Sequence, residues 1–282
     1  MKLIYYFFVT AIMSTASFAE ISISERNALI DLNKATCGDH WFTKWNLNKP
    51  VSSWFGVKLE NGKVVALDLS SNNLSGILPS EISNLIHLKS LILFQNNISG
   101  ALPASIGNMK SLEVLNISFN KLSGSLSPQF CDATSLKSVE LFMNNLSGAI
   151  PSEIKNLKRL EVLSLFNNQI SGELPATLFQ LTLLKVLHLN SNNISGNLSS
   201  AIANLTSLEH LSLFDNNMNG QIPLDLEKLH QLKEMNISFN NFNGFVSRNL
   251  AQKDMLKMTM VNEFGVVSAL KVEIEKAIVS EE

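Results

Sequence analysis

The stretch that decides the fold is LKSLILFQNNISGALPASIGNMKS, residues 88–111, because its pattern returns as LEVLSLFNNQISGELPATLFQLTL at residues 160–183. The pattern repeats every 24 residues and never slips. Eight consecutive units begin at Val64, Leu88, Leu112, Leu136, Leu160, Leu184, Leu208 and Leu232. A fixed period of this length is typical of a protein that stacks one small structural unit on the next.

Alternating apolar residues open each unit. In the second unit, Leu91 and Leu93 alternate with outward-pointing residues such as Phe94, which predicts a short strand. One unit cannot bury its own apolar edge, so neighbouring units must stack. We therefore predict an α/β solenoid, an arc with a concave parallel β-sheet and short helical or 3-10 turns on the convex side.

An asparagine stands at the end of every predicted strand. A buried amide both donates and accepts hydrogen bonds, so a column of amides can satisfy the turn backbone of its own unit and of the next. We assign this asparagine ladder a structural role. Its members are Asn72, Asn96, Asn120, Asn144, Asn168, Asn192, Asn216 and Asn240.

Two further columns shape each unit after the asparagine. A glycine such as Gly124 or Gly148 marks a bend where we expect a side chain to be in the way. In most units a proline then starts the convex turn, where a missing N–H does no harm. These prolines are Pro79, Pro103, Pro151, Pro175 and Pro223.

The residue after the first apolar position of each unit alternates in charge. This column predicts opposite charges side by side on neighbouring strands, which penalises a slip of one unit. Because exposed charge runs usually serve a solvated face, we interpret the column as register control and not as a binding site. It comprises Lys89, Glu113, Lys137, Glu161, Lys185, Glu209 and Lys233.

The segment Asn144-Asn145-Leu146-Ser147-Gly148-Ala149-Ile150-Pro151 shows the motif N-x-L-S-G-x-I/L-P, which recurs from Val64 to about Met255. This motif resembles the plant-type leucine-rich repeats of receptor-kinase ectodomains, polygalacturonase-inhibiting proteins and secreted bacterial proteins. The resemblance implies an arc-shaped binder of proteins or, less often, of glycans. Since we expect neither a transmembrane helix nor a kinase after the repeats, the receptors' signalling role does not carry over.

Residues 20–63 look like the N-terminal cap of that class. Ser22 and Glu25 would form a capping box, and Trp41, Trp45 and Trp54 would cover the open end of the core. Here the chain departs from the plant pattern, which has a cysteine pair where Ser52 and Leu59 stand.

Three further segments complete the predicted organisation. Residues 1–19 carry one lysine, an apolar run and small residues before Ala19, which predicts a signal peptide cleaved there and a secreted, cell-surface or periplasmic product. The alternative is an uncleaved anchor, but the apolar run is shorter than the roughly 20 residues of a membrane-spanning helix. Residues 64–255 form the eight repeats. Residues 256–282 form a C-terminal cap, with a truncated ninth strand from Leu256 and a tail that fits a helix or an alternating strand.

Composition limits the class of partner. Lys and Arg number 22 against 24 Asp and Glu, a net charge of -2, so no strong field favours nucleic acid or an anionic membrane. The two cysteines, Cys37 and Cys131, lie too many units apart for a disulfide, and we expect two free, buried thiols. We expect a monomer.

Large apolar side chains recur on the predicted concave face, in the two columns after the last inward leucine. Strand pairing puts Phe142 next to Phe166, and contiguous exposed aromatics often mark an interaction site. The alternative is that these rings only pack along the sheet edge. We expect the centre of the site at Phe142, Met143 and Phe166. The candidate partner-binding residues of this stripe are Phe94, Phe119, Phe142, Met143, Phe166, Phe214 and Phe239.

A second candidate lies toward the C-terminal units. His188 and His210 are diagonal on adjacent strands, and Glu234 lies beside His210 one unit on. We expect these three residues to tune one end of the binding face; a solvated polar surface or an adventitious metal site are the alternatives. No nucleophile with a base, metal motif or phosphate loop is found, so we expect no catalytic residues, no bound metal and no cofactor.

The sequence as a whole predicts an exported protein that binds a protein, or secondarily a glycan, on its concave face. Two other functions stay open. One is a structural or adhesive surface protein without a selective site. The other is an inhibitor of a secreted glycanase, which rests on analogy alone.

Overall fold

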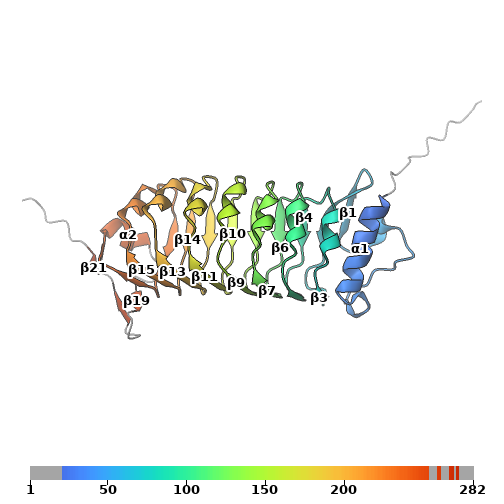
Figure 1. Cartoon of the computed structure of the whole chain (residues 1–282), viewed down its shortest axis with the longest axis horizontal. Helices are drawn as coiled ribbons and strands as arrows, with labels where there is room; N and C mark the ends of the chain where they lie inside the picture. The colour runs from blue at the N-terminus through green and yellow to red at the C-terminus, as the bar shows by residue number, and fades with distance from the viewer. Residues whose placement is uncertain (1–20, 254–258, 262–266, 270, 273–282) are drawn as a thin grey trace, which may run out of the picture.

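The computed structural model describes residues 21–253, 259–261, 267–269 and 271–272. The chain forms a long arc with the helix α1 (Ile23–Ala35) at one end and the helix α2 (Arg248–Lys253) near the other (Figure 1). The predicted signal peptide lies outside the described residues.

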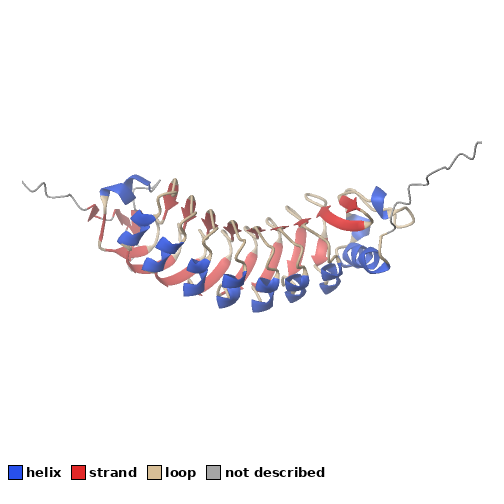
Figure 2. Cartoon of the chain, turned by 90° about the horizontal axis from the view of Figure 1, so that it is seen from above, coloured by secondary structure: helices blue, strands red, loops and turns tan. Residues whose placement is uncertain are grey.

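A nine-stranded sheet runs along the concave side of the arc (Figure 2). Strands β2 to β16 of this sheet pair in parallel, each with the strand 24 residues further on, such as Leu163 with Leu187. Only β1 is antiparallel to its neighbour. The strands are β1 (Val57–Glu60), β2 (Lys63–Asp68), β4 (Ser90–Ile92), β6 (Val114–Asn116), β8 (Ser138–Glu140), β10 (Val162–Ser164), β12 (Val186–His188), β14 (His210–Ser212) and β16 (Glu234–Asn236).

Short 3-10 turns lie along the convex side, which confirms the predicted solenoid (Figure 2). The prolines of the repeat stand immediately before these turns, in extended conformation. Ser199 replaces proline in one unit and accepts a hydrogen bond from the N–H of Ala201. The turns are η3 (Ser80–Asn84), η4 (Ala104–Asn108), η5 (Pro128–Asp132), η6 (Ser152–Asn156), η7 (Ala176–Gln180), η8 (Ser200–Asn204) and η9 (Leu224–Lys228).

A second, eight-stranded parallel sheet was not predicted. Its strands begin just after the asparagine ladder and most of them contain the Ser-Gly of the N-x-L-S-G motif, so each unit contributes two strands and not the single strand expected from sequence. They are β3 (Ser75–Ile77), β5 (Asn97–Gly100), β7 (Lys121–Ser125), β9 (Asn145–Gly148), β11 (Gln169–Glu173), β13 (Asn193–Asn197), β15 (Asn217–Gln221) and β17 (Asn241–Asn243).

The ladder asparagines connect each unit to its neighbours through backbone groups. The amide nitrogen of Asn120 donates to the carbonyls of Leu93, Ile117 and Ser118 at 2.9, 3.2 and 3.1 Å. Its carbonyl oxygen accepts from the N–H of Ile98 at 2.9 Å. Both ends of one amide therefore satisfy buried backbone groups of two adjacent units.

The glycine column is required by backbone conformation and not by crowding alone, which corrects the expectation from sequence. Gly124 has a φ of +78°, yet an added Cβ would have 3.7 Å to its nearest neighbour. The left-handed conformation is costly for other residues even where there is room. Only at some positions is space also short: at Gly76 an added Cβ would lie 2.1 Å from the carbonyl oxygen of Ala35.

The N-terminal end of the core is closed by α1, the turns η1 (Gly38–His40) and η2 (Val51–Ser53), and three buried tryptophans. Trp45 stacks on Trp54 with ring centroids 4.8 Å apart and meets Trp41 edge-on at 4.9 Å. Ser22 caps α1 by accepting from the N–H of Glu25. The Glu25 carboxylate does not return to the Ser22 backbone, as a full capping box requires. It accepts from the Ser22 hydroxyl and from the N–H of Val64, and so fixes α1 to the first repeat.

The two cysteines are free, as predicted, but only Cys131 is buried. Burial raises the pKa of the Cys131 thiol to about 12, so it is inert at neutral pH. Cys37 is exposed, which corrects the prediction. The reason is local, since Cys37 adopts a left-handed conformation just after α1, between the helix and η1.

At the C-terminal end, the described part of the predicted cap is extended. Strand β18 (Phe245–Val246) pairs in parallel with β21 (Lys271–Val272). Strand β19 (Thr259–Val261) pairs with β20 (Val267–Ala269), not with the concave sheet. The remaining residues of the predicted cap lie outside the described ranges.

The asparagine ladder makes a stability prediction. We expect Asn120→Ala to lower the free energy of unfolding by about 1–3 kcal/mol, because it leaves buried backbone groups without partners. Urea and thermal unfolding measure the change. Asn145→Ala is the matched control, since Asn145 is exposed and one position beyond the ladder in the next unit. Equal losses in the two variants would contradict a structural role for the ladder.

Candidate binding surface

Four phenylalanines and a histidine from successive units form a continuous row of rings on the concave face, here called the aromatic ladder. Phe94 meets Phe119 edge-on with centroids 5.3 Å apart, and Phe119 meets Phe142 in the same way at 5.5 Å. Phe142 stacks on Phe166 at 4.4 Å with only 10° between the ring planes. Phe166 in turn contacts the ring of His188 at 6.5 Å. The predicted adjacency of Phe142 and Phe166 is confirmed.

The ladder is partly buried by its own stacking. Phe119 is its most open phenylalanine, with 42% of its surface exposed, whereas Phe94, Phe142 and Phe166 are half-buried. Met143, which follows Phe142 in the chain, is 37% exposed. The two interpretations of the sequence are therefore compatible. The rings pack along the sheet and still present a contiguous apolar surface to solvent.

Three of the predicted site residues, Phe119, Met143 and Phe239, have a left-handed backbone, and two of them are aromatic. Phe119 and Phe239 have φ values of 53° and 56°, in the left-handed region that bulky residues rarely enter. Asn167 and Asp215, whose side chains tolerate this region better, occupy the same column in other units. Phe119 is the eighth residue of its unit, whereas Phe94 and Phe142 are the seventh residues of theirs. The ring of Phe119 nevertheless lies between the rings of Phe94 and Phe142.

The aromatic ladder ends at His188 in the sixth unit, because Asn190 stands there in the column that holds Phe166 and Phe214 in the units on either side. Beyond this break, Phe214 meets Phe239 at 5.2 Å and forms a separate pair. A hollow of about 230 Å³ opens at the break. Its walls include Phe166, His188, Asn190, His210, Ser212 and Glu234.

Sequence reasoning found the two histidines and Glu234 but not Asn190 or Ser212. The available signal was the single amide in the phenylalanine column between Phe166 and Phe214. A smaller side chain between two large ones leaves a gap in a close-packed row.

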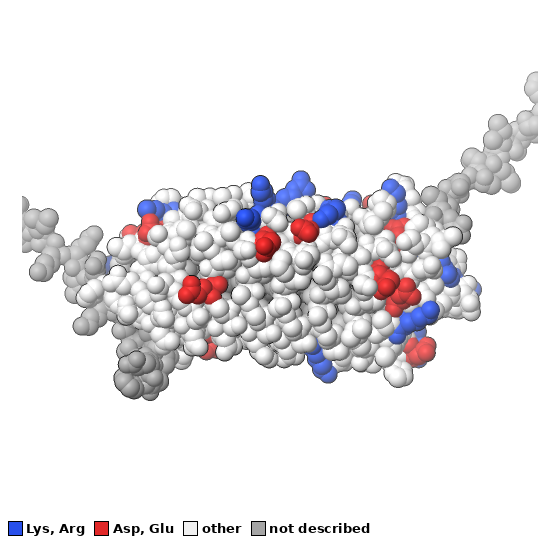
Figure 3. Space-filling model, viewed as in Figure 1, with Lys and Arg blue, Asp and Glu red and all other residues white. Residues whose placement is uncertain are grey.

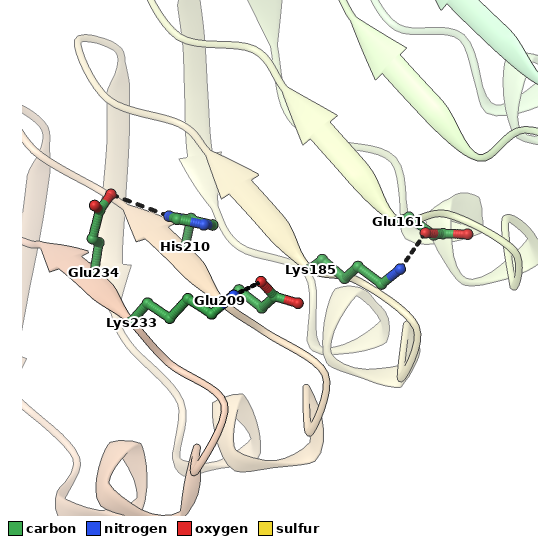
Figure 4. Close-up of polar contacts among 6 residues, drawn as sticks. All are labelled: Glu161, Lys185, Glu209, His210, Lys233 and Glu234. Carbon is green, nitrogen blue, oxygen red and sulfur yellow. Dashed lines mark hydrogen bonds and ion pairs between the residues drawn. The ribbon is translucent and has the colours of Figure 1, made fainter.

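The three predicted polar residues do come together. His210 lies between Val186 and Glu234 in the strand register, and its Nδ1 is 3.1 Å from a carboxylate oxygen of Glu234 (Figure 4). His188 is diagonal to His210 and lines the same hollow. Burial, followed by the nearby His210, lowers the pKa of His188 below its ordinary value of 6.5, against a smaller opposite effect of Glu234. The His188 ring is therefore neutral at pH 7.

The alternating charge column lies beside the concave face and forms ion pairs, as predicted. Each pair joins a glutamate to the lysine one unit further on. Lys137 is 2.6 Å from Glu113. Lys185 is 2.6 Å from Glu161, and Lys233 bonds Glu209 (Figure 4). These exposed pairs contribute little stability individually, at most about 1 kcal/mol.

Elsewhere the surface is weakly charged. In the view of Figure 3, the charged side chains are sparse and of both signs, and most of the surface is uncharged. Among the described residues no cluster of three or more His, Cys, Asp or Glu side chains has the arrangement of a metal site. No helix within the described ranges has the length and apolar character needed to cross a membrane.

Comparison with known families agrees with this architecture. Residues 127–274 match a family model described as a leucine-rich repeat region, and residues 62–122 match a leucine-rich repeat model. The chain belongs to the leucine-rich repeat family.

Solved structures of plant receptors have the same repeat architecture. The ectodomain of the Arabidopsis thaliana receptor kinase GASSHO1/SCHENGEN3, in complex with CASPARIAN STRIP INTEGRITY FACTOR 2, is 36% identical with a TM-score of 0.63, over 68% of this chain and 23% of that chain. The plant peptide hormone receptor RGFR1 in complex with RGF2 is 28% identical with a TM-score of 0.66, over 74% of this chain and 32% of that chain. PEPR1 with AtPEP1 is 25% identical with a TM-score of 0.74, over 89% of this chain and 35% of that chain. This leucine-rich repeat chain thus spans between 23% and 35% of those receptor chains.

The strained conformation of Phe119 predicts an unusual mutational result. Phe119→Asn loses two ring contacts, each worth about 0.5–1.5 kcal/mol, but relieves a left-handed conformation that costs about 1–2 kcal/mol. We therefore expect its free energy of unfolding to stay within about 1 kcal/mol of the parent. Phe166→Asn loses two ring contacts without that relief and should be clearly less stable. If urea unfolding shows the reverse order, Phe119 is not strained.

The environment of His188 predicts its titration. In an NMR titration of the histidine ring protons, His188 should titrate below 6.5, and His188→Gln assigns its signal. Because the unfolded chain binds this proton more readily, His188 lowers stability as the pH falls below 6.5. Between pH 7.5 and pH 5, the melting temperature of the parent should therefore fall relative to that of His188→Gln. The exposed His230→Gln serves as the control. A His188 that titrates at or above 6.5 would refute the burial argument.

Proposed function

We propose that this chain is an exported binding protein that holds a segment of another protein on its concave face. The observation that carries the proposal is the aromatic ladder, five rings in unbroken contact from Phe94 to His188 on an unpartnered sheet. Aromatic side chains in such rows bring a large contact area and lose little conformational freedom on binding. The Phe214–Phe239 pair extends the apolar surface beyond the hollow.

The related structures support a protein ligand. The plant peptide hormone receptor RGFR1 was solved in complex with RGF2, and the ectodomain of the receptor kinase GASSHO1/SCHENGEN3 in complex with CASPARIAN STRIP INTEGRITY FACTOR 2. A rigid stack of units offers a preformed surface, so little entropy is lost when an extended segment binds across several strands. The N-terminal residues 1–19 supply the export signal in this proposal, which places the protein at the cell surface, in the periplasm or in the medium.

Capture of partners from the producing organism tests the proposal. Immobilised protein of residues 20–282 is incubated with the medium and with surface extracts, beside the Phe142→Ser, Phe166→Ser double variant. We expect the parent to retain a defined protein and the double variant to lose it at least tenfold, while circular dichroism shows that both are folded.

The outcomes separate the open functions. Retention of the same protein by both forms would refute the ladder as the site. Capture of nothing, together with concentration-dependent self-association measured by sedimentation, would favour a structural or adhesive role. A captured glycanase that loses activity in the complex would make the protein an inhibitor.

A further inference from the structure

The outward positions of the concave face carry acidic side chains but no lysine or arginine. Its outward positions in the eight units are the third, fifth, seventh and eighth residues, such as Val162, Ser164, Phe166 and Asn167 in the fifth unit. Across all eight units these positions contain no lysine or arginine. They contain four acids, namely Asp68, Glu140, Asp215 and Glu234.

The nearest lysines do not offset this imbalance. Three of the four lysines in the flanking column, Lys137, Lys185 and Lys233, are each engaged by a glutamate of the same column. Their charges are thus neutralised beside the face and not on it. The fourth, Lys89, acts electrostatically on Glu60 and Glu113 and helps to lower the pKa of both carboxyl groups. The unpartnered sheet keeps a negative potential over the same surface that carries the aromatic ladder.

The hollow at the break in the ladder is the polar part of this surface. The side chains of His188, Asn190 and Ser212 line it, and none of them makes a hydrogen bond to another of the described residues. Glu234 stands at the same hollow, and its side chain is 64% exposed although its carboxylate contacts His210. The hollow therefore brings these three acceptors, the carboxylate of Glu234 and the ring of Phe166 together.

We propose that the bound segment is basic as well as apolar, with apolar side chains on the aromatic ladder and a guanidinium or ammonium group in the hollow beside Glu234. The inference rests on the proposed function and names the chemistry of its partner. A cation there gains an ion pair with Glu234, hydrogen bonds to Asn190 and Ser212, and attraction to the ring of Phe166. An anionic group in the hollow would be repelled by Glu234.

Protonation of the hollow opposes such a cation. The groups that face His188 are His210 on β14, Glu234 on β16 and the ring of Phe166 next to β10. At neutral pH the His188 ring is uncharged and offers an acceptor. As the pH falls through the lowered pKa of His188, an imidazolium forms in the hollow and the basic segment binds more weakly.

Selection from a random peptide display library tests the inference without knowledge of the natural partner. The protein of residues 20–282 is immobilised, and the peptide sequences that it enriches are compared with those of the unselected library. We expect enrichment of peptides that combine arginine or lysine with apolar residues. The most enriched peptide is then synthesised with its basic residue intact, replaced by glutamine and replaced by glutamate.

Fluorescence anisotropy of these peptides gives the decisive comparison. The glutamine peptide should bind about tenfold more weakly to the parent, and the glutamate peptide more weakly still. Glu234→Gln should weaken binding of the basic peptide by a similar factor and leave the glutamine peptide unaffected. Glu227→Gln, an exposed change on the convex turn η9, should alter neither.

Each result bears on the inference separately from the proposed function. Enriched peptides without basic residues, or equal affinities in the parent and Glu234→Gln, overturn the inference. If enriched peptides without basic residues bind the parent but fail to bind the Phe142→Ser, Phe166→Ser variant, the aromatic ladder stands as the binding site. No enrichment at all overturns the inference, and the capture of natural partners then decides the proposed function alone.

Discussion

The hydrogen bonds of the asparagine ladder are the constraint on which the rest of the structure depends. Each unit ends its concave strand in a tight turn whose carbonyls and N–H groups face the interior, away from water. One buried amide, such as that of Asn144, donates to the carbonyls of Ile117, Leu141 and Phe142 and accepts from the N–H of Leu122. Because these groups belong to two successive units, the same contact that closes one turn also sets the spacing to the next.

That spacing explains why the concave face is able to carry a site. Successive strands place equivalent side chains in adjacent positions, so a phenylalanine that recurs in the repeat becomes a row of touching rings. The left-handed residue before each ladder asparagine belongs to the same turn, and in two units it holds Phe119 and Phe239 at an energetic cost. The exception at Asn190 produces the hollow. A regular scaffold thus turns single substitutions into local surface features without disturbing the core.

The architecture was largely predictable from sequence because a 24-residue period fixes which residues of successive units lie side by side. The Phe142–Phe166 adjacency, the His210–Glu234 contact and the ion pairs of the charge column all followed from counting positions. The second sheet did not follow, since Ser-Gly in N-x-L-S-G indicates a bend more readily than a strand. The amide at Asn190 stands out in the phenylalanine column, but the hollow depends on the volume that is missing there. Cys37 is exposed in a left-handed conformation, which a pattern of apolar and polar positions does not reveal.

The central claim is that the concave aromatic surface is where this protein binds its partner. Carbene footprinting with mass spectrometry, on the free protein and on the protein bound to the partner that it captures, tests this claim most directly. We expect Phe119 and Met143, both open in the free protein, to lose labelling in the complex, while Leu183 and Leu224 of the convex side keep theirs. Protection of Leu183 and Leu224 with unchanged labelling of Phe119 and Met143 would contradict it.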